Sequence, residues 1–310
     1  MADSVSVAII QAEPVYYNLA ETLTKAIDLI HDAHQKGAQL ITFGETFFPG
    51  YPVWLDICSD MGLWDHEPTK QVFARLVKNS PAVDGAEITQ LRDIAKQLGI
   101  VLVLPINERV MRGAGNGTLY NTILTVDSNG EVVNHHRKLV PTYTERIVWG
   151  AGDGAGLQAV DTAVGRVGGL VCWEHWMPLA RQTLHESAEQ IHIAAWPTVK
   201  EILQVASRHY AHEGRTYVLA AGSILHAKQV PEELTISGEI KPTDLVQRGG
   251  SAIIAPDGEY IVEPVYNKEA ILTADLDLER IIQENMTLDV TGHYARPDIF
   301  QLAVNRNRTP

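Results

Sequence analysis

Short apolar segments alternate with amphipathic segments along most of this chain, and this alternation restricts the folds open to it. Residues 5–11 and 38–43 are apolar enough to form buried strands, and the residues between them repeat apolar side chains at helical spacing up to Gly37. The same order recurs where a helix is predicted over 84–98 and a strand over 100–106. Strand, helix and strand in succession indicate a sheet that is covered by helices.

The rest of the chain adds hairpins to these crossovers. Predicted strands at 118–126 and 131–138 flank the turn sequence DSNG, which is typical of a hairpin. Further elements are strands at 167–171, 191–195, 217–221, 251–255, 259–262 and 270–275, and helices after Cys172 and over 198–214. Residues 44–64, rich in aromatic residues, Pro and Gly, predict a long loop. We therefore expect one α/β domain over residues 1–280 and a tail over 281–310 that makes oligomer contacts.

The composition restricts the partners and the compartment. The 310 residues include 25 Lys and Arg against 38 Asp and Glu, a formal net charge of −13, which argues against nucleic acid or an anionic membrane as the main partner. No apolar run is long enough for a transmembrane helix, and the N-terminus lacks the pattern of a signal peptide. Two cysteines, Cys58 and Cys172, exclude a disulfide scaffold and fit a reducing setting. We expect a cytoplasmic protein.

Cys172 is the most informative candidate for chemistry. A short strand, 167–171, delivers it to what the sequence predicts is a sharp turn into a helix. A thiol at a helix N-terminus can be held as a thiolate and become a nucleophile. A buried structural cysteine is the alternative, because free cysteine is often buried.

Three further polar residues follow predicted strands or lie in the next loop. Glu45 follows strand 38–43 among apolar groups, which would raise its pKa and suit a general base, although it can equally be a solvated loop residue. Lys138 ends strand 131–138 and can stabilise an oxyanion or simply face water. Glu145 can serve the same site or only pair with Arg146. Catalytic groups of α/β folds collect at strand ends, but spacing alone does not show that these residues meet.

Three motifs in order resemble those of the nitrilase (carbon-nitrogen hydrolase) superfamily. They are the glutamate motif at 44–52 (GETFFPGYP), the lysine motif at 136–142 (HRKLVPT) and the cysteine motif at 169–174 (GLVCWE). Finer features resemble the nitrilase branch itself, namely 172–175 (CWEH), 195–197 (AWP) and 292–298 (GHYARPD). The resemblance extends over roughly residues 5–280, where the predicted strands agree with the family order.

The resemblance implies an α-β-β-α sandwich that becomes four-layered on dimerisation, in a homodimer or larger homo-oligomer. It implies that Cys172 is the nucleophile, Glu45 the general base and Lys138 the group that stabilises developing negative charge, with the Trp173 backbone N–H as a second donor. Glu145 matches an additional glutamate that positions substrate or water. The implied reaction turns an organic nitrile and two waters into a carboxylic acid and ammonia through a thioimidate and a thioester, without a cofactor or metal.

The substrate pocket is harder to predict. Tyr51, Trp173, Trp196 and Pro197 lie in or beside the motifs and are candidates to line an apolar site, and Val205 is a further candidate on the following helix. Core packing is the alternative for these side chains, above all for Trp196.

The sequence gives less support to a histidine metal site or to a thiol-protease pair. The adjacent His135 and His136 point to opposite faces of a strand, and His209 and His212, which can share a helix face, lack an H-E-x-x-H motif. A Cys172–His175 pair resembling that of thiol proteases is an alternative that the glutamate and lysine motifs make unnecessary.

Other functions remain open within and outside the family. A cyanide hydratase or dihydratase, or an aliphatic amidase or carbamoylase, would use the same three residues on a different substrate. A catalytically silent scaffold on the same fold is the alternative outside enzymes.

Overall fold

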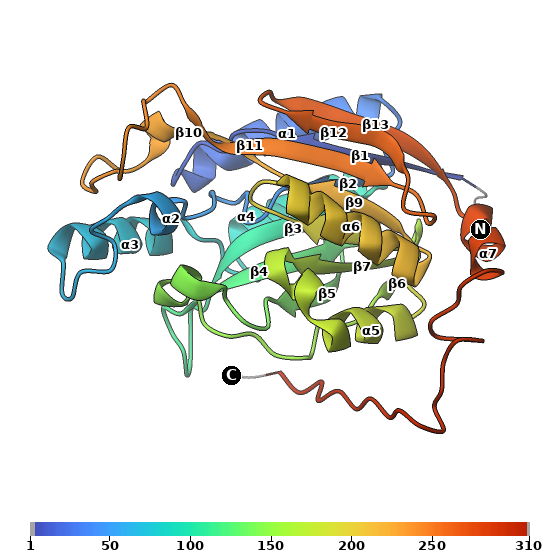
Figure 1. Cartoon of the computed structure of the whole chain (residues 1–310). Coiled ribbons are helices and arrows are strands. Elements are labelled where there is room, and N and C mark those ends of the chain that lie inside the picture. The colour runs from blue at the N-terminus through green and yellow to red at the C-terminus, as the bar shows by residue number, and fades with distance from the viewer. Residues whose placement is uncertain (1–3, 309–310) are drawn as a thin grey trace.

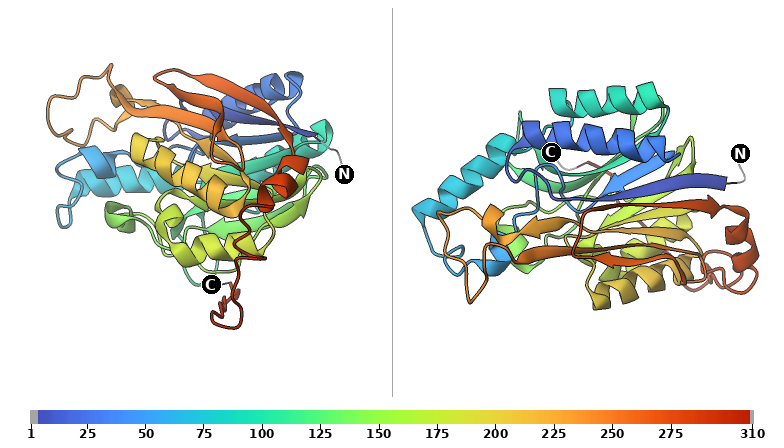
Figure 2. Two further views of the ribbon diagram at one scale, coloured as in Figure 1. Left: turned by 45° about the vertical axis from the view of Figure 1, so that its right-hand side comes forward. Right: turned by 90° about the horizontal axis from the view of Figure 1, so that it is seen from above.

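A computed structural model describes residues 4–308 and contains two β-sheets that lie face to face (Figures 1 and 2). Within these residues the first sheet has the order β13-β1-β2-β3-β4-β5, formed by β1 (Ser4–Gln11), β2 (Leu40–Phe43), β3 (Val101–Arg109), β4 (Leu119–Val126), β5 (Val132–Arg137) and β13 (Ala270–Asp277). The second has the order β10-β11-β9-β8-β7-β6, with β12 paired to β11, formed by β6 (Val160–Thr162), β7 (Gly165–Val171), β8 (Ile191–Ala195), β9 (Tyr217–Ala221), β10 (Ile224–His226), β11 (Leu245–Ile254) and β12 (Tyr260–Tyr266).

Helices cover the outer face of each sheet, so that the layers are α, β, β and α (Figure 2). Helices α1 (Leu19–Gln35) and α4 (Ala86–Leu98) pack on the first sheet, and their apolar faces form one buried cluster with it. Helices α5 (Pro178–Glu186) and α6 (Glu201–Gly214) pack on the second sheet, whose cluster also fills the space between the sheets. The predicted α-β-β-α sandwich is confirmed.

Parallel strands determine where the polar loop residues gather. Strands β1, β2 and β3 run parallel in the first sheet, and β7, β8 and β9 run parallel in the second. Helix α1 begins where the Asn18 side chain accepts the N–H of Glu21, and α4 ends at Gly99, whose φ of 66° is left-handed. The chain therefore returns to the same edge after each crossover, and the loops that follow β2, β7 and β8 meet there.

Several elements depart from the sequence-based predictions. The long loop over 44–64 contains one helical turn, α2 (Trp54–Ile57), and is followed by α3 (Glu67–Asn79), which was not predicted because it buries little more than Val72 and Leu76. The helix expected directly after Cys172 is a single 3-10 turn, η2 (Cys172–Trp176), before α5 begins at Pro178. Short elements that the sequence did not reveal are η1 (Tyr143–Ile147), η3 (Ala227–Gln229), α7 (Glu279–Asn285), β6 and β10.

The end of the described chain packs along the molecule without regular structure. After α7, residues 286–308 contain no helix or strand and run along the lower edge in Figure 1. Arg306 donates to the carbonyl oxygen of Leu157 and Arg308 forms an ion pair of 3.2 Å with Asp153, beside the loop that follows the lysine motif. Across residues 4–308, none of the helices combines the length and the apolar character needed to cross a membrane.

Candidate active site

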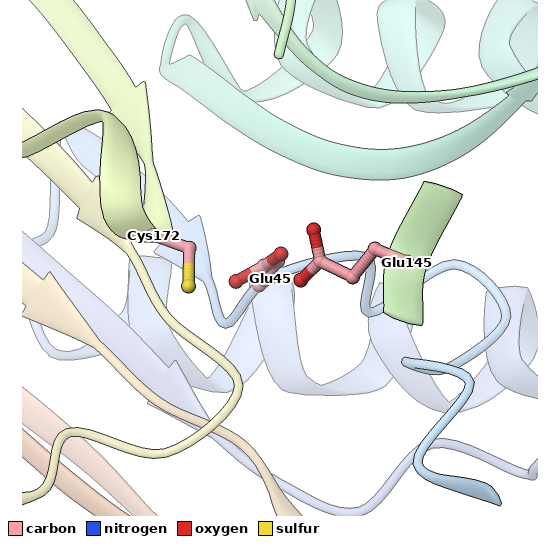
Figure 3. A group of neighbouring side chains, drawn as sticks. All are labelled: Glu45, Glu145 and Cys172. Carbon is pink, nitrogen blue, oxygen red and sulfur yellow. The ribbon is translucent and has the colours of Figure 1, made fainter. Parts of the chain in front are cut away.

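Strand ends from both sheets bring together the side chains singled out in the sequence. Glu45 follows β2 and Lys138 follows β5 in the first sheet, whereas Cys172 follows β7 in the second. Glu145 comes from η1. Figure 3 shows Cys172, Glu45 and Glu145 pointing toward one another from three separate segments.

The four side chains form one buried cluster. The Lys138 ammonium donates to Glu145 Oε2 at 2.6 Å and to Glu45 Oε1 at 3.4 Å. The Cys172 Sγ and one oxygen of each glutamate lie within 4.8 Å of one another. Arg146, the alternative partner of Glu145, instead donates to the carbonyl oxygen of Pro141. The juxtaposition that spacing could not establish is therefore present.

Cys172 occupies a strained turn. Its φ is 52°, in the left-handed region that residues other than glycine seldom adopt. The short β7-to-η2 turn imposes this conformation, which places the thiol at the strand end and between the two sheets. Such backbone outliers persist where the surrounding structure holds them and are frequent at active sites.

The surroundings of Cys172 favour its protonated thiol. Burial and the Glu45 carboxylate raise the pKa of the Cys172 thiol well above its usual value, and the Lys138 ammonium and the Trp173 backbone N–H oppose the shift only in part. The expectation of a thiolate held by a helix N-terminus is corrected, because η2 is a single 3-10 turn. Activation of the thiol therefore requires a neighbouring base.

Glu45 has the position and the proton affinity of that base. Burial raises the pKa of Glu45 to about 7, against the opposing effect of the Lys138 ammonium. Its Oε1 accepts from Asn121 Nδ2 at 2.6 Å and from Lys138, whereas its Oε2 has no hydrogen-bond partner among the described residues. The free oxygen can take the thiol proton. Asn121 was missed in the sequence, where the one available signal is an amide within the otherwise ordinary strand β4.

A cavity of about 560 Å³ opens onto Cys172 and Glu145. Three of the candidate pocket residues, Tyr51, Trp173 and Pro197, line it. Further lining residues come from η1, α6 and β11, and they include Tyr143, Ile202, Leu203 and Val246. The cavity is mixed in character, with apolar walls around a polar base, which suits a small organic molecule.

Two of the expected pocket residues lie elsewhere. Trp196 is fully buried, stacks on His175 with ring centroids 4.6 Å apart, and donates its indole N–H to Ser207 Oγ at 3.2 Å. It therefore belongs to the core behind the site. Val205 is 54% exposed and does not line the cavity, because the first turn of α6 is the part that reaches it.

Comparison with known proteins identifies the family of this chain. The profile of the family described as carbon-nitrogen hydrolase matches residues 6–284. The chain belongs to the carbon-nitrogen hydrolase family.

Similar proteins include several nitrilases by name. The chain is 37% identical to an aliphatic nitrilase of Sinorhizobium fredii (strain HH103), over 96% of this chain and 94% of that one. It is 36% identical to a nitrilase of Pseudomonas syringae pv. syringae (strain B728a), over 100% and 92%. It is 37% identical to a bifunctional nitrilase/nitrile hydratase of Oryza sativa subsp. japonica, over 98% and 85%.

Solved structures agree on the fold. The carbon-nitrogen hydrolase of Helicobacter pylori G27 superposes with a TM-score of 0.69 at 19% identity, over 96% of this chain and 97% of that one. The NitFhit protein of C. elegans superposes with a TM-score of 0.73 at 18% identity, over 99% of this chain and 68% of that one.

A second glutamate of the cysteine motif ties the two sheets together in this carbon-nitrogen hydrolase. Glu174 accepts the backbone N–H groups of Val171 at 2.7 Å and Leu139 at 2.8 Å, and its other contact is His136 at 3.0 Å. These donors and burial compete, and the pKa of Glu174 is lowered. The ionised Glu174 therefore fixes the end of β7 against the residue that follows Lys138. This role of Glu174 was not predicted from the sequence.

The adjacent histidines of β5 contact two separate carboxylates. His135 contacts Glu108 and His136 contacts Glu174, on opposite faces of β5 as predicted. Among residues 4–308, the one group of His, Cys, Asp and Glu side chains with the spacing of a metal site is Glu45, Glu145 and Cys172. Lys138 already donates to both glutamates, so a second cation there would face its positive charge.

The pair proposed between Cys172 and His175 also has a different form. The His175 Nδ1 donates to the backbone carbonyl oxygen of Cys172 at 2.7 Å, not to the thiol. The His175 Nδ1 therefore does not face the Cys172 thiol.

Replacing Tyr51 with phenylalanine tests how Glu145 is held. The Tyr51 hydroxyl donates to Glu145 Oε1 at 3.1 Å, and the Thr142 backbone N–H donates to Glu145 Oε2 at 2.7 Å. Losing a hydrogen bond to a charged group should lower kcat/KM by about tenfold or more, with an unchanged fold. Steady-state kinetics with a thermal melt will check this, and an unchanged kcat/KM would show that the hydroxyl does not position Glu145.

Proposed function

We propose that this carbon-nitrogen hydrolase is a nitrilase, which converts an organic nitrile and two waters into a carboxylic acid and ammonia. The observation that carries the proposal is the buried Cys172 thiol beside the unpartnered Oε2 of Glu45, with the Lys138 ammonium in contact with both glutamates. Similarity to proteins named nitrilases over nearly the whole chain supports the choice of nitrile as substrate.

The first half of the reaction forms a thioimidate. The Cys172 Sγ attacks the nitrile carbon, while its proton passes to Glu45 Oε2. One π pair of the C≡N bond moves to nitrogen, which receives a proton returned by Glu45. The Lys138 ammonium and the Trp173 backbone N–H are donors for the charge that develops on nitrogen and, later, on oxygen.

The second half releases the two products. Glu45 takes a proton from a first water, which adds to the thioimidate carbon and gives a tetrahedral intermediate. Glu45 returns this proton to the nitrogen, the hydroxyl proton follows as the C=O bond forms, and the nitrogen leaves as ammonia, so that a thioester remains and Glu45 is again ionised. A second water, again deprotonated by Glu45, displaces the Cys172 sulfur, which regains its proton as the acid departs.

Amide release is a second outcome of the same intermediate. If sulfur leaves the first tetrahedral intermediate before ammonia does, the product is the amide. Relatives named bifunctional nitrilase/nitrile hydratase favour considering this branch. The partition depends on whether the nitrogen or the sulfur is better protonated, which Glu45 and Lys138 control.

To test the proposal, we would measure the ammonia, acid and amide released from a panel of nitriles. The matching amides and cyanide would be assayed as substrates in parallel. Acid and ammonia from nitriles with inert amides would support a nitrilase. Turnover of amides alone would indicate an amidase or carbamoylase, and turnover of cyanide alone a cyanide hydratase or dihydratase. No turnover of any compound would contradict the enzyme assignment and favour a silent scaffold.

The pH dependence of the reaction follows from Glu45. Burial raises the pKa of this carboxyl to about 7, and only its ionised form accepts the thiol proton. We expect kcat/KM to fall as pH decreases through about 7, by about tenfold for each further unit. In Glu45→Gln this decrease of kcat/KM at low pH should disappear, and the rate should fall by a factor of about 10² to 10⁴. A wild-type profile that stays flat through this range would contradict the assignment of the base.

We also propose that one domain over residues 1–280 carries the activity and that the tail over 281–310 contributes to a homodimer or larger homo-oligomer. Two unpaired cysteines and the acidic net charge of −13 support a reducing, cytoplasmic setting. Light scattering on the full chain will measure the assembly, and a monomer at all concentrations would contradict it.

A further inference from the structure

A buried chain of hydrogen bonds begins at the backbone of the nucleophile and leads away from the cavity. The carbonyl oxygen of Cys172 contacts His175 Nδ1 at 2.7 Å, and His175 Nε2 contacts His192 Nε2 at 2.9 Å. His192 Nδ1 contacts Glu189 Oε1 at 2.8 Å, and Tyr210 donates to Glu189 Oε2 at 2.6 Å. All five residues are buried, and the proposed reaction uses only the thiol of the first.

The direction of these hydrogen bonds follows from the carbonyl oxygen of Cys172, which can only accept. A carbonyl oxygen only accepts, so His175 Nδ1 carries a proton. Burial and the neighbouring His192 lower the pKa of His175 to about 3, so the ring is neutral and its Nε2 accepts. His192 Nε2 must then donate. Burial also lowers the pKa of His192, so this ring too is neutral and its Nδ1 accepts. The partner of that nitrogen, Glu189 Oε1, must carry a proton.

The surroundings of Glu189 favour this neutral form. Burial raises the pKa of Glu189 to about 8, and the Tyr210 hydroxyl and the nearby His185 reduce the shift only in part. The carboxyl packs against Gly168 of β7, where a Cβ would collide with Oε1. The groups that face it are thus Tyr210 from α6, His185 from α5 and His192 from β8.

More distant charges are already paired. His185 contacts Glu213 at 3.2 Å, and Glu213 also pairs with Arg181 at 2.7 Å. A second cavity, of about 520 Å³, is lined by Glu189, Arg166 and Arg215. Within the described residues, Arg166 pairs with Asp161 and Arg215 with Glu284, and no ion pair joins either arginine to Glu189.

We propose that Glu189 is a positioning residue, which as a neutral acid donates a proton into this chain and so holds the Cys172 turn in its strained conformation. The φ of 52° at Cys172 needs such support, and the chain fixes the carbonyl oxygen of that same residue. The proposal rests on the proposed function only in that Cys172 is the reacting group. An ionised Glu189 has no proton for His192 Nδ1, so the chain cannot keep all of its hydrogen bonds while both rings are neutral.

Two buried glutamates give a matched pair of variants. In Glu189→Gln the amide N–H₂ donates to His192 and the amide oxygen accepts from Tyr210, which reproduces the neutral acid. In Glu174→Gln one oxygen becomes an amide N–H₂, which turns a donor toward a group that itself donates, the N–H of either Val171 or Leu139. We expect Glu189→Gln to keep activity within about threefold and Glu174→Gln to lose about a hundredfold. Glu189→Met, which fills the space without hydrogen bonds, should lose about tenfold or more in kcat with little change in KM.

The experiment combines three readouts on the full-length protein. Nitrile hydrolysis against pH gives the first. Wild type should lose activity as pH rises through about 8, because Glu189 ionises, and Glu189→Gln should lack this step. The alkylation rate of Cys172 by iodoacetamide, followed by mass spectrometry, gives the second without any nitrile. Nitrogen-15 NMR of the histidine rings gives the third, with the proton expected on Nδ1 of His175 and on Nε2 of His192.

The outcomes separate this proposal from the proposed function. If no nitrile reacts but alkylation of Cys172 is equal in wild type and Glu189→Gln and slower in Glu189→Met, the nitrilase proposal fails and the role of Glu189 stands. If Glu189→Gln behaves like Glu189→Met, or if NMR shows His192 protonated on Nδ1 or either ring doubly protonated, this proposal is overturned. Thermal melts will show whether each variant is folded. If Glu189→Met does not fold, Glu189→Gln decides the test.

Discussion

Replacing Cys172 with alanine is expected to reduce nitrile turnover to background, a loss on the order of 10⁶ in kcat as for other enzymes that lose their nucleophile. The second cysteine offers no substitute, because Cys58 lies in a separate apolar cluster with Trp54 and Leu55. Water held by Glu45 cannot replace the sulfur, since without a thioimidate the nitrile carbon meets only a weak nucleophile. Alanine keeps the Cβ, so the strained φ at this position and the fold should be unchanged.

Cys58→Ala is the matched control for this result. Burial and Asp60 raise the pKa of Cys58 to about 11, and this thiol lies outside the cluster in which Glu45 can accept the proton of Cys172. We expect the variant to keep wild-type turnover and iodoacetamide to modify Cys172 in preference to Cys58. Ammonia release by Cys172→Ala at a rate above background would refute the covalent mechanism.

The active-site cluster was predictable because its members lie at strand ends within recognisable motifs. Glu45, Lys138 and Cys172 each follow a strand directly, and apolar periodicity located those strands to within a few residues. Once two sheets face each other, the ends of β2, β5 and β7 have one place to meet. Local sequence therefore located these residues, and their side-chain types suggested the chemistry proposed for them.

The supporting contacts were not predictable, because they depend on side chains packing across layers. Asn121 holds Glu45 from the neighbouring strand β4, a contact that no spacing in the sequence indicates. Trp196 was as plausible in the pocket as in the core, and only the stacking on His175 decides between them. Glu189 belongs to none of the sequence motifs, and its link to Cys172 exists only through the two histidines between them.

Replacing Lys138 with methionine is expected to lower both activity and stability, for one electrostatic reason. Lys138 is fully buried, and burial alone would lower its pKa, but Glu45, Cys172 and Glu145 outweigh burial and raise it. Without the ammonium, two carboxylates remain buried without a counter-ion, which should reduce the free energy of unfolding by about 3–5 kcal/mol. Loss of an oxyanion donor alone should reduce kcat by about 10²–10³, and the total loss should be larger.

The larger loss arises because Lys138 also controls the base. The ammonium opposes the upward shift in the pKa of Glu45, so its removal should raise that pKa further and move the acid limb of kcat/KM to higher pH. A second variant, Lys138→Met with Glu145→Gln, removes one charge of each sign and should recover much of the stability measured in urea. Activity should not return with it, because stability depends on the balance of charge whereas catalysis depends on the donor. If the double variant regained activity together with stability, Lys138 would be a structural counter-ion and not the group that stabilises the transition state.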